Sequence, residues 1–503
     1  MGDRNLSEFQ CHFTWDFMNL AKRTKLYLRD HINKIERELS SQNSEGSKQK
    51  KRNFPQLYSL RGFLFVQLCQ KTDEGGQELL EKAEISLMKA LEECTEDNDG
   101  YRAVIYADLI HLKQKWKHEN ADEEIKKYSV SENKENHPEV LAMKGYAASF
   151  FHCYEDAIKF YKEALEKQKT SEWVFGLALV MQRPRVRLNN SHQRQEIEKL
   201  LKEALRLDPS YDMAKLKLAQ ELWEDKATRD ENKQDIDDLI DQVLKKPDNP
   251  PTVLVTATTL LCEVDNRKGE NALKEALAKY PNSHKISRAL GTMYFERWRK
   301  NKKNESELKL AIEYYTKGID SESANMMASF DITTIGYFHT IAFWYYKNNG
   351  ILKKAEEHRQ ECKSWNEKAE GYLLKDQYDL KSYIETLHKI SHYYKYFGED
   401  PAKEKEYLVE VLSKGNEGIE QEELQELIFF KKAKNRLLEI AEAYPDEVEK
   451  LKFMSWVYEQ SYEFDKAIDH LRRAMANVWE EEILKDMLEQ EAILLSKMVE
   501  QEM

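Results

Sequence analysis

The sequence has few of the residues that build turns, and no stretch that could span a membrane. Ten prolines and 17 glycines make up about 5% of the 503 residues, whereas an average protein has about 12% of these two residues. Folds with many short strands need glycine and proline at their turns, so sandwiches and propellers are excluded. Collagen, which needs glycine at every third position, is excluded as well. No run of about 18 apolar residues occurs and the N-terminus has no apolar segment, so we expect neither a membrane span nor secretion.

Cysteine is also scarce, and the 78 basic residues are outnumbered by 91 acidic ones. The six cysteines lie far apart without a CxxC pair, which excludes a zinc cluster and a dense disulfide framework. We expect reduced thiols, mostly in the core, at Cys11, Cys69, Cys94, Cys153, Cys262 and Cys362. The net charge of −13 excludes a general attraction to phosphate, so any nucleic-acid site must be a local basic pocket.

Signs of catalysis and of cofactor binding are missing as well. The chain has no P-loop, no GxSxG and no glycine-rich dinucleotide turn. His388 and His392 lie one helical turn apart, but no third metal ligand is indicated, and structural histidines are favoured. We expect no enzyme, no cofactor and no metal site.

What the sequence does have is charge and apolar material in amounts typical of amphipathic helices. Charged residues make up 34% and hydrophobic residues 41% of the chain, which suits helices with one apolar face. A chain of 503 residues is too long for one core, since single cores stop growing at roughly 250–300 residues. Several domains or a helical repeat remain.

An internal repeat decides between these two. Gly145 is followed 12 residues later by Ala157, then by Tyr161 and Ala164, which is the small/small/aromatic/small spacing of a tetratricopeptide unit. The same grid returns near the C-terminus at Ser455, Tyr458, Ala467, Leu471 and Ala474. Partial copies in register occur at Ala204 with Pro209, Ala276 with Pro281, Gly291 with Tyr294, and Ala311 with Tyr315 and Gly318.

The repeat predicts an all-α tetratricopeptide-repeat superhelix, an α-solenoid of about twenty or more helices with a central groove or tunnel. We expect three parts, residues 1–245, 246–350 and 351–503, with a pivot at Pro250 and Pro251. Irregular stretches are predicted at 40–55, 183–195, 245–251 and 299–306, the last one a loop of extra residues between two helices.

Several segments resemble the interferon-induced proteins with tetratricopeptide repeats. They are CHFTW at 11–15, HPEV and KGY within 137–146, SEWVFGLALVMQR at 171–183, ALRLDPS at 204–210 and SWVY at 455–458. The resemblance implies a cytoplasmic, non-enzymatic antiviral protein of innate immunity. Several members of this family hold the 5′ end of foreign RNA in a positively charged tunnel, and others act as protein partners.

The resemblance also implies particular RNA-binding residues. Arg183 matches a phosphate-contacting arginine, Glu172 matches an acidic pocket residue, and Tyr146 replaces a tryptophan that stacks on a base. Lys34 is a possible tunnel residue. Phe150 stands in place of a pocket lysine, which is a loss. The family's central basic cluster is replaced by neutral residues at Thr252, Val255, Thr256 and Thr259.

Other basic and aromatic residues have two readings. Arg185, Arg187 and Arg194 extend the arginine cluster begun by Arg183, and guanidinium groups suit phosphate oxygens, although arginines beside a loop are often solvated or paired with acids. The KQKKR stretch at 48–52 fits a solvated loop better than a nucleic-acid patch. For most of the paired aromatic residues, core packing is the better interpretation.

Two functions of different classes remain. The first is a protein that binds single-stranded RNA with a 5′-triphosphate or a cap and blocks its translation. The second is a scaffold that binds protein partners, a paralogue or a second copy of itself without RNA, which the acidic net charge and the neutral residues at 252–259 favour.

Overall fold

The computed structural model describes most of the chain. The described residues are 10–15, 24–42, 53–72, 75–95, 97–115, 136–183, 191–246, 248–300, 304–319, 328–373, 380–419 and 421–502. Within these ranges the chain forms 23 α-helices and no strand, which confirms the all-α prediction.

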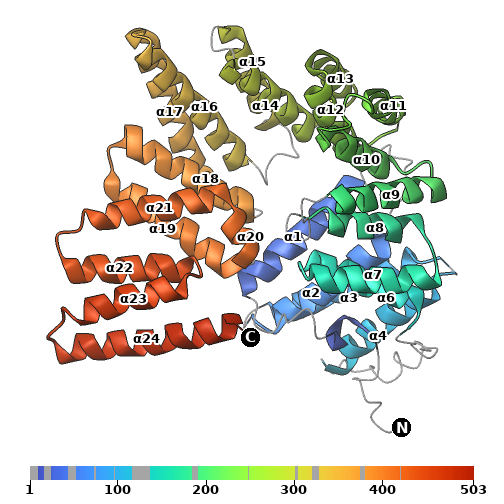
Figure 1. Cartoon of the computed structure of the whole chain (residues 1–503), viewed down its shortest axis with the longest axis horizontal. Helices are drawn as coiled ribbons and strands as arrows, with labels where there is room; N and C mark the ends of the chain where they lie inside the picture. Colours follow the sequence, from blue (N-terminus) through green and yellow to red (C-terminus); the bar gives the residue numbers. More distant parts are fainter. Residues whose placement is uncertain are drawn as a thin grey trace. The chain divides into compact units, whose positions relative to one another are not determined.

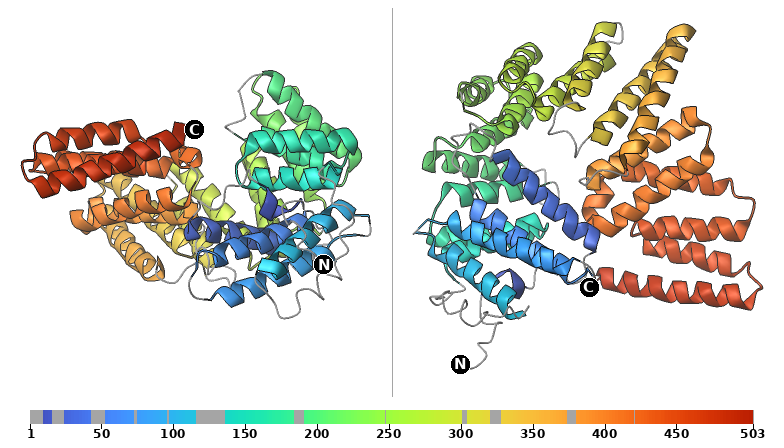
Figure 2. Two further views of the ribbon diagram at one scale, coloured as in Figure 1. Left: turned by 90° about the horizontal axis from the view of Figure 1, so that it is seen from below. Right: turned by 180° about the vertical axis from the view of Figure 1, so that it is seen from behind.

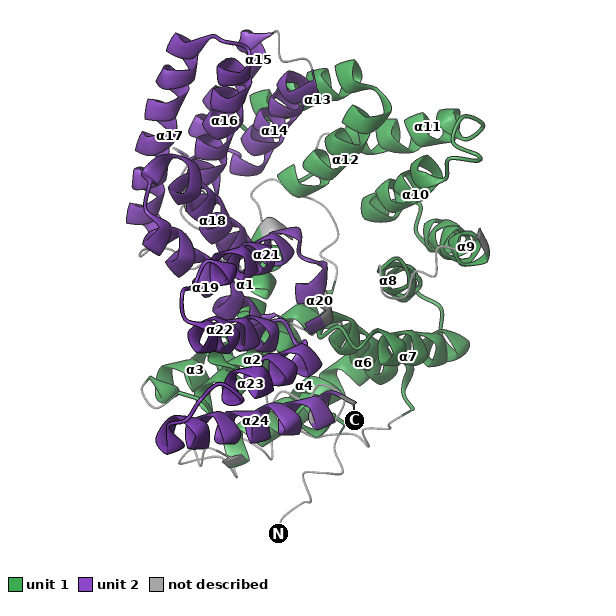
Figure 3. Ribbon diagram, turned by 60° about the vertical axis from the view of Figure 1, so that its left-hand side comes forward, with its two compact units in different colours: residues 1–281 green, residues 282–503 purple. Residues whose placement is uncertain are grey.

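The helices form two compact units, residues 1–281 and 282–503 (Figure 3). The predicted three-part division at 245 and 350 stays a prediction. Pro250 and Pro251, the predicted pivot, start a helix within the first unit. The helices of unit 1 are η2 (His12–Thr14), α1 (Lys25–Gln42), α2 (Phe54–Cys69), α3 (Gly76–Glu92), α4 (Asp99–Lys115), α6 (Pro138–Phe150), α7 (Tyr154–Lys167), α8 (Ser171–Met181), α9 (Ser191–Leu207), α10 (Asp212–Glu224), α11 (Lys233–Leu244), α12 (Pro251–Val264) and α13 (Asn266–Lys279).

Unit 2 continues the same architecture to the C-terminus. Its helices are α14 (His284–Lys300), α15 (Glu305–Ile319), α16 (Ala328–Asn348), α17 (Leu352–Leu373), α18 (Leu380–Tyr393), η6 (Tyr394–Gly398), α19 (Pro401–Gly418), α20 (Gln421–Glu426), α21 (Ile428–Glu442), α22 (Glu447–Gln460), α23 (Phe464–Met475) and α24 (Glu481–Glu502). The η6 segment is a single π-helical turn directly after α18.

Consecutive helices pack as hairpins, and hairpins stack on their neighbours within each unit. The pairs α6–α7, α8–α9 and α10–α11 in unit 1, and α14–α15, α16–α17 and α22–α23 in unit 2, are in contact and run antiparallel (Figure 1). Helices α22, α23 and α24 lie side by side in both views of Figure 2. Each hairpin hides its apolar face only by stacking, as expected of a solenoid.

The small residues of the repeat let paired helices approach one aromatic ring. A Cβ atom on Gly145 would lie 3.1 Å from the Tyr161 ring, and one on Gly176 would lie 2.8 Å from the same side chain. Ala157 and Ala164 are fully buried on either side of Tyr161. One tyrosine of α7 therefore fills the space between the first helices of two successive hairpins.

The other copies of the repeat pack in the same way. A Cβ atom on Gly291 would lie 2.3 Å from Cδ2 of Tyr315. Ser455, fully buried in α22, donates a hydrogen bond of 2.7 Å to the carbonyl oxygen of Ala467 in α23. These contacts confirm the tetratricopeptide-type hairpins predicted from spacing.

Two predicted irregular stretches are shorter than expected. Helix α9 begins at Ser191, so the predicted loop over 183–195 was wrong for its last five residues. Of the predicted loop over 299–306, residues 299 and 300 belong to α14, residues 305 and 306 belong to α15, and residues 301–303 lie outside the described part of the chain. The helical ends of these stretches, residues 191–195, 299–300 and 305–306, contain neither glycine nor proline, which permits helix there. Residues 43–52, with KQKKR, and 184–190 lie outside the described part of the chain.

The CHFTW segment is part of the core of unit 1. The His12 backbone N–H donates to Asp108 Oδ1 at 3.0 Å, and the His12 ring Nδ1 lies 2.7 Å from Asp108 Oδ2. Ser59 donates to the same carboxylate at 3.1 Å. Cys11, His12 and Trp15 are all buried. The pentapeptide that carried the resemblance therefore has a structural role, as the anchor of the N-terminal segment on α2 and α4.

All six cysteines are free thiols, and Cys69, Cys94 and Cys153 pack against the core of unit 1 that contains Cys11. Only Cys11 and Cys362 are buried, and the other four are half-buried.

Candidate nucleic-acid interface

Two of the predicted RNA-binding residues lie near opposite ends of α8, Glu172 in its first turn and Arg183 two residues after its end. Thr170 caps its start by accepting a hydrogen bond of 3.2 Å from the Trp173 N–H, and the Trp173 indole donates to the Tyr101 hydroxyl at 2.8 Å. These contacts fix the start of α8 in the core, and its other end leads to Arg183, whose side chain is exposed.

Glu172 and Arg183 lie far apart along the chain direction of α8. Eleven residues at a rise of 1.5 Å separate them by about 16 Å along the helix. Glu172 accepts a hydrogen bond of 2.9 Å from Ser171 and lies close enough to Tyr101 to help raise the pKa of that phenol. One phosphate group cannot contact both residues.

Arg183 is instead brought close to a lysine that the sequence did not single out. Lys217 of α10 is half-buried, and burial, followed by the positive charge of Arg183, lowers its pKa. The Lys217 ammonium donates to Gln220 Oε1 at 3.0 Å. Within the described residues, neither Arg183 nor Lys217 forms an ion pair with a carboxylate.

Two carboxylates of α10 lie near this pair, and each is held by an amide. Gln182 donates to Glu221 at 2.8 Å, which also ties the end of α8 to α10. Gln220 donates to Glu224 at 2.8 Å. Glu221 and Glu224 partly offset the repulsion at Lys217. We define Arg183 and Lys217 as the cation pair of unit 1.

Tyr146 and Lys34 belong to a second region, where α1 approaches α6. Burial, and next the charge of Glu38, raise the pKa of Tyr146 well above that of a free phenol. Glu38 lies one turn after Lys34 on α1, and the Lys34 ammonium pairs with Asp30 at 2.8 Å. Lys34 is therefore already neutralised, and the group that acts on Tyr146 from α1 is an acid.

The neutral replacements seen in the sequence have structural partners. Phe150 packs edge-on against His31 of α1, with ring centroids 5.3 Å apart. The Thr256 hydroxyl donates to the Thr252 carbonyl oxygen within α12 at 2.9 Å. Thr252, Val255 and Thr256 are half-buried and Thr259 is exposed. No charge is present at these positions to bind a phosphate.

The other three arginines of the predicted cluster do not extend the described cation pair. Arg185 and Arg187 lie outside the described residues. Arg194 of α9 is half-buried, and its Nη1 donates to the Glu224 carbonyl oxygen at 3.4 Å. This long hydrogen bond ties α9 to the end of α10. Of the two described arginines of the cluster, Arg183 is the exposed one.

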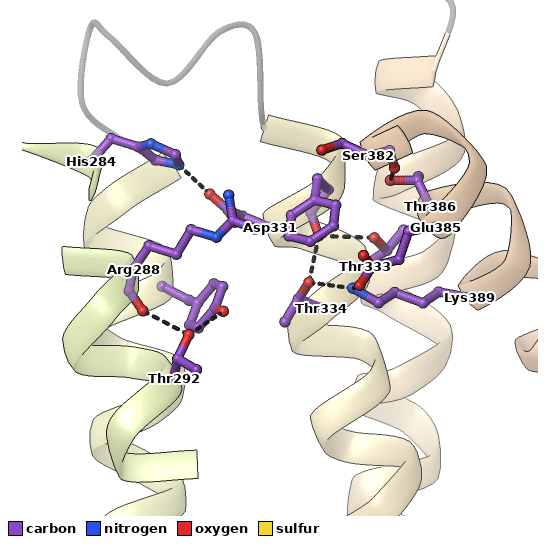
Figure 4. A network of polar contacts seen from close by, with 12 residues as sticks. His284, Arg288, Thr292, Asp331, Thr333, Thr334, Ser382, Glu385, Thr386 and Lys389 are labelled. Carbon is purple, nitrogen blue, oxygen red and sulfur yellow. Dashed lines mark hydrogen bonds and ion pairs between the residues drawn. The ribbon is translucent and has the colours of Figure 1, made fainter. Parts of the chain in front are cut away.

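Unit 2 contains a polar network that joins α14, α16 and α18 (Figure 4). Asp331, fully buried on α16, binds His284 and lies 3.5 Å from Arg288 of α14. Lys389 of α18 donates to Thr334 at 2.8 Å and pairs with Glu385 at 2.7 Å. Arg288 and Lys389 each have an acid partner, and the network joins three helices.

His388 and His392 lie on α18 beside aromatic rings. His388 packs against Phe429 at 5.2 Å and His392 against Tyr396 at 4.5 Å. Burial and neighbouring positive charges lower the pKa of His388 to about 3 and of His392 to about 4. Both rings are therefore neutral at pH 7.

Among the described residues, every helix falls short of the combined length and apolar character that a bilayer span needs.

The fold defines a class, the α-solenoids of tetratricopeptide-type hairpins. Searches for particular relatives found no matching protein-family model and no matching curated protein.

Solved structures similar to the chain include two of human IFIT1 and one from yeast. The human IFIT1 dimer with m7Gppp-AAAA is 16% identical, covers 94% of this chain and 99% of its own, and has a TM-score of 0.46. The human IFIT1 dimer with PPP-AAAA has the same identity and coverage and a TM-score of 0.43. Yeast Tom70 is 12% identical over 95% of this chain and 96% of its own, with a TM-score of 0.30. At these values the similarity does not carry a function over to this chain.

Proposed function

We propose that the chain is a cytoplasmic, non-enzymatic protein of innate immunity that binds single-stranded RNA bearing a 5′-triphosphate or a cap and blocks its translation. The observation that supports this function is the cation pair of Arg183 and Lys217. Gln182, the neighbour of Arg183, donates a hydrogen bond of 2.8 Å to Glu221, one turn after Lys217 on α10. After burial, the charge of Arg183 is the next cause that lowers the pKa of Lys217. An anion bound between them would relieve that repulsion.

The chemistry of the pair suits a phosphate at an RNA end. The exposed Arg183 guanidinium offers a fork of donors to two phosphate oxygens, and Lys217 adds a point charge. Local binding of this kind does not require a basic protein, and it agrees with the net charge of −13. The RNA groove or tunnel predicted from the sequence belongs to this proposal.

The test compares one short RNA carrying a 5′-triphosphate, a cap or a 5′-hydroxyl on three proteins. They are the wild type, Arg183→Glu and the control Arg206→Glu, whose arginine is exposed on α9 and pairs with Glu203 at 2.7 Å. Arg183→Glu should weaken the binding of triphosphate RNA by about 1–3 kcal/mol, and Arg206→Glu should leave this binding unchanged. Unchanged affinity in Arg183→Glu would remove this residue from the site.

A second candidate function is a scaffold that pairs with a second copy of the chain. Helix α24 leaves Leu488, Leu495 and Val499 exposed at 52%, 37% and 52%. Spacings of seven and four residues place these side chains on one helical stripe, as in a helix that pairs with another helix.

The oligomeric state tests the scaffold. Light scattering of the wild type should give twice the chain mass of 59.5 kDa, and Leu495→Glu should give the monomer. A monomeric wild type at micromolar concentration argues against pairing through α24.

A further inference from the structure

Four aromatic rings of unit 2 form a connected row across two neighbouring helices. The ring of Tyr337 on α16 lies 6.2 Å from that of His392 on α18, and His392 lies 4.5 Å from Tyr396 in η6. Tyr396 in turn lies 5.7 Å from Trp344 on α16. Tyr337 and Trp344 are seven residues apart and so share one face of α16. We call Tyr337, Trp344, His392 and Tyr396 the ring platform.

The ring platform is accessible, unlike most aromatic residues of the repeat. Tyr337 is 36% exposed and Tyr396 is 39% exposed. By contrast, Tyr161 and Tyr315, which stand at the repeat positions, are each only 4% exposed. The π-helical turn of η6 buries Tyr394 and Phe397 and leaves Lys395 and Tyr396 outside. π-Helical turns are rare in proteins, and those that occur often lie at functional sites.

Three exposed lysines surround the rings. The Lys347 ammonium lies 4.9 Å from the Trp344 ring centroid, and the Lys395 ammonium lies 5.1 Å from that of Tyr396. Lys432 of α21 is close enough to His392 to help lower the pKa of that imidazole. Within the described residues none of these three lysines pairs with a carboxylate, although many other lysines of unit 2 do.

The acids that face the ring platform are already neutralised. Glu296 and Glu385 both act on Tyr337. Glu296 pairs with Arg299 at 2.7 Å and Glu385 pairs with Lys389 at 2.7 Å. The surface therefore combines neutral, flat rings with a local excess of positive charge on an acidic protein.

We propose that the ring platform binds single-stranded nucleic acid by stacking its unpaired bases, while Lys347, Lys395 and Lys432 contact the phosphates. Sequence-tolerant binders of single strands combine these two elements, aromatic stacking and backbone cations. Lysine is depleted in protein–protein interfaces, so the three unpaired lysines favour a nucleic acid over a folded protein as the ligand. The inference shares RNA as ligand with the proposed function but concerns other residues and does not need a 5′ phosphate.

The test uses an eight-nucleotide RNA with a 5′-hydroxyl and follows its binding by anisotropy. Tyr396→Ala should weaken binding about fivefold to a hundredfold, while Tyr396→Phe, which keeps a stacking ring, should bind as the wild type does. Trp479→Ala is the matched control because Trp479 is 96% exposed and lies outside the ring platform. A blunt duplex of the same sequence should bind far more weakly, since its bases are stacked internally.

A second readout reports stacking directly. Single-stranded RNA at saturating concentration should quench part of the tryptophan fluorescence of the wild type, and this part of the quenching should be lost in Trp344→Phe. Arg183→Glu should bind the 5′-hydroxyl RNA normally.

If Trp479→Ala lost as much affinity for the 5′-hydroxyl RNA as Tyr396→Ala, or if Tyr396→Ala bound this RNA as the wild type does, the ring platform would not be the binding site. The proposed function would still stand if Arg183→Glu weakened the binding of triphosphate RNA. Absence of any RNA binding would overturn both proposals.

Discussion

At the scale of single residues, buried acceptors explain the sequence motifs better than ligand contacts do. Asp108 is fully buried on α4 and receives hydrogen bonds from His12 and Ser59. The His12 ring also packs between Trp15 at 4.6 Å and Phe63 at 5.5 Å. A motif shared with a family can thus reflect shared packing, and its presence alone does not establish RNA binding.

Asp108→Asn should destabilise unit 1 by about 1.5–3 kcal/mol, because hydrogen bonds to a charged acceptor are lost inside the core. Calorimetry of unfolding measures the change. The control is Asp241→Asn, since Asp241 is 55% exposed and only pairs with Lys245 at the surface, where the expected cost is below about 1 kcal/mol. Equal effects of the two substitutions would contradict the anchoring role of Asp108.

The residues that formed the repeat were predictable, and those that form the sites were not. Gly145 and Tyr161 stand at fixed local spacings, so the sequence alone shows that they pack together. Arg183 and Lys217 are 34 residues apart, and Trp344 and Tyr396 are 52 apart, on helices that meet only through the register of stacked hairpins. The sequence singled out Arg183 but contains no local pattern that would identify Lys217 as its neighbour.

At the scale of helices, the spacing within a hairpin depends on single small residues. Gly291→Ala should destabilise the α14–α15 hairpin by about 1–3 kcal/mol, because the new methyl group would overlap Tyr315. For a unit of this size each kcal/mol lowers the melting temperature by about 2–4 °C. Gly371→Ala is the control, because nothing lies within 4 Å of its added Cβ. That substitution should be neutral or stabilising by up to about 1 kcal/mol, and a destabilisation equal to that of Gly291→Ala would refute the steric explanation.

Helices α16 and α18 should lose stability in mild acid. Burial lowers the pKa of His339 to about 3, of His388 to about 3 and of His392 to about 4, whereas an unfolded histidine has a pKa of about 6.5. Below pH 6.5 the unfolded chain therefore takes up protons that the folded chain does not, so stability is present above pH 6.5 and falls as the pH decreases toward 4.

Hydrogen exchange of peptides from α18, corrected for the intrinsic effect of pH, measures this loss of stability. His388→Gln should reduce the pH dependence, because it removes one of the three groups. A pH dependence equal to that of the wild type would show that His388 does not contribute.

At the scale of the whole molecule, binding has to work against the net charge of −13. An acidic protein that binds RNA through a few local cations should show a shallow dependence of affinity on salt. Each lost phosphate contact to a single strand should reduce the slope of log K against log salt by about 0.7. A salt series on wild type and Arg183→Glu measures the difference, and equal slopes would mean that Arg183 contacts no phosphate.

The most direct test of RNA binding is to find where an RNA end lies on the protein. A 5′-triphosphate RNA with one 4-thiouridine at its second nucleotide is crosslinked by long-wavelength light, and the crosslinked peptides are identified by mass spectrometry. The account predicts crosslinks to α8 and α10, beside Arg183 and Lys217, and their loss in Arg183→Glu. Crosslinks confined to other helices, or none at all, would contradict it.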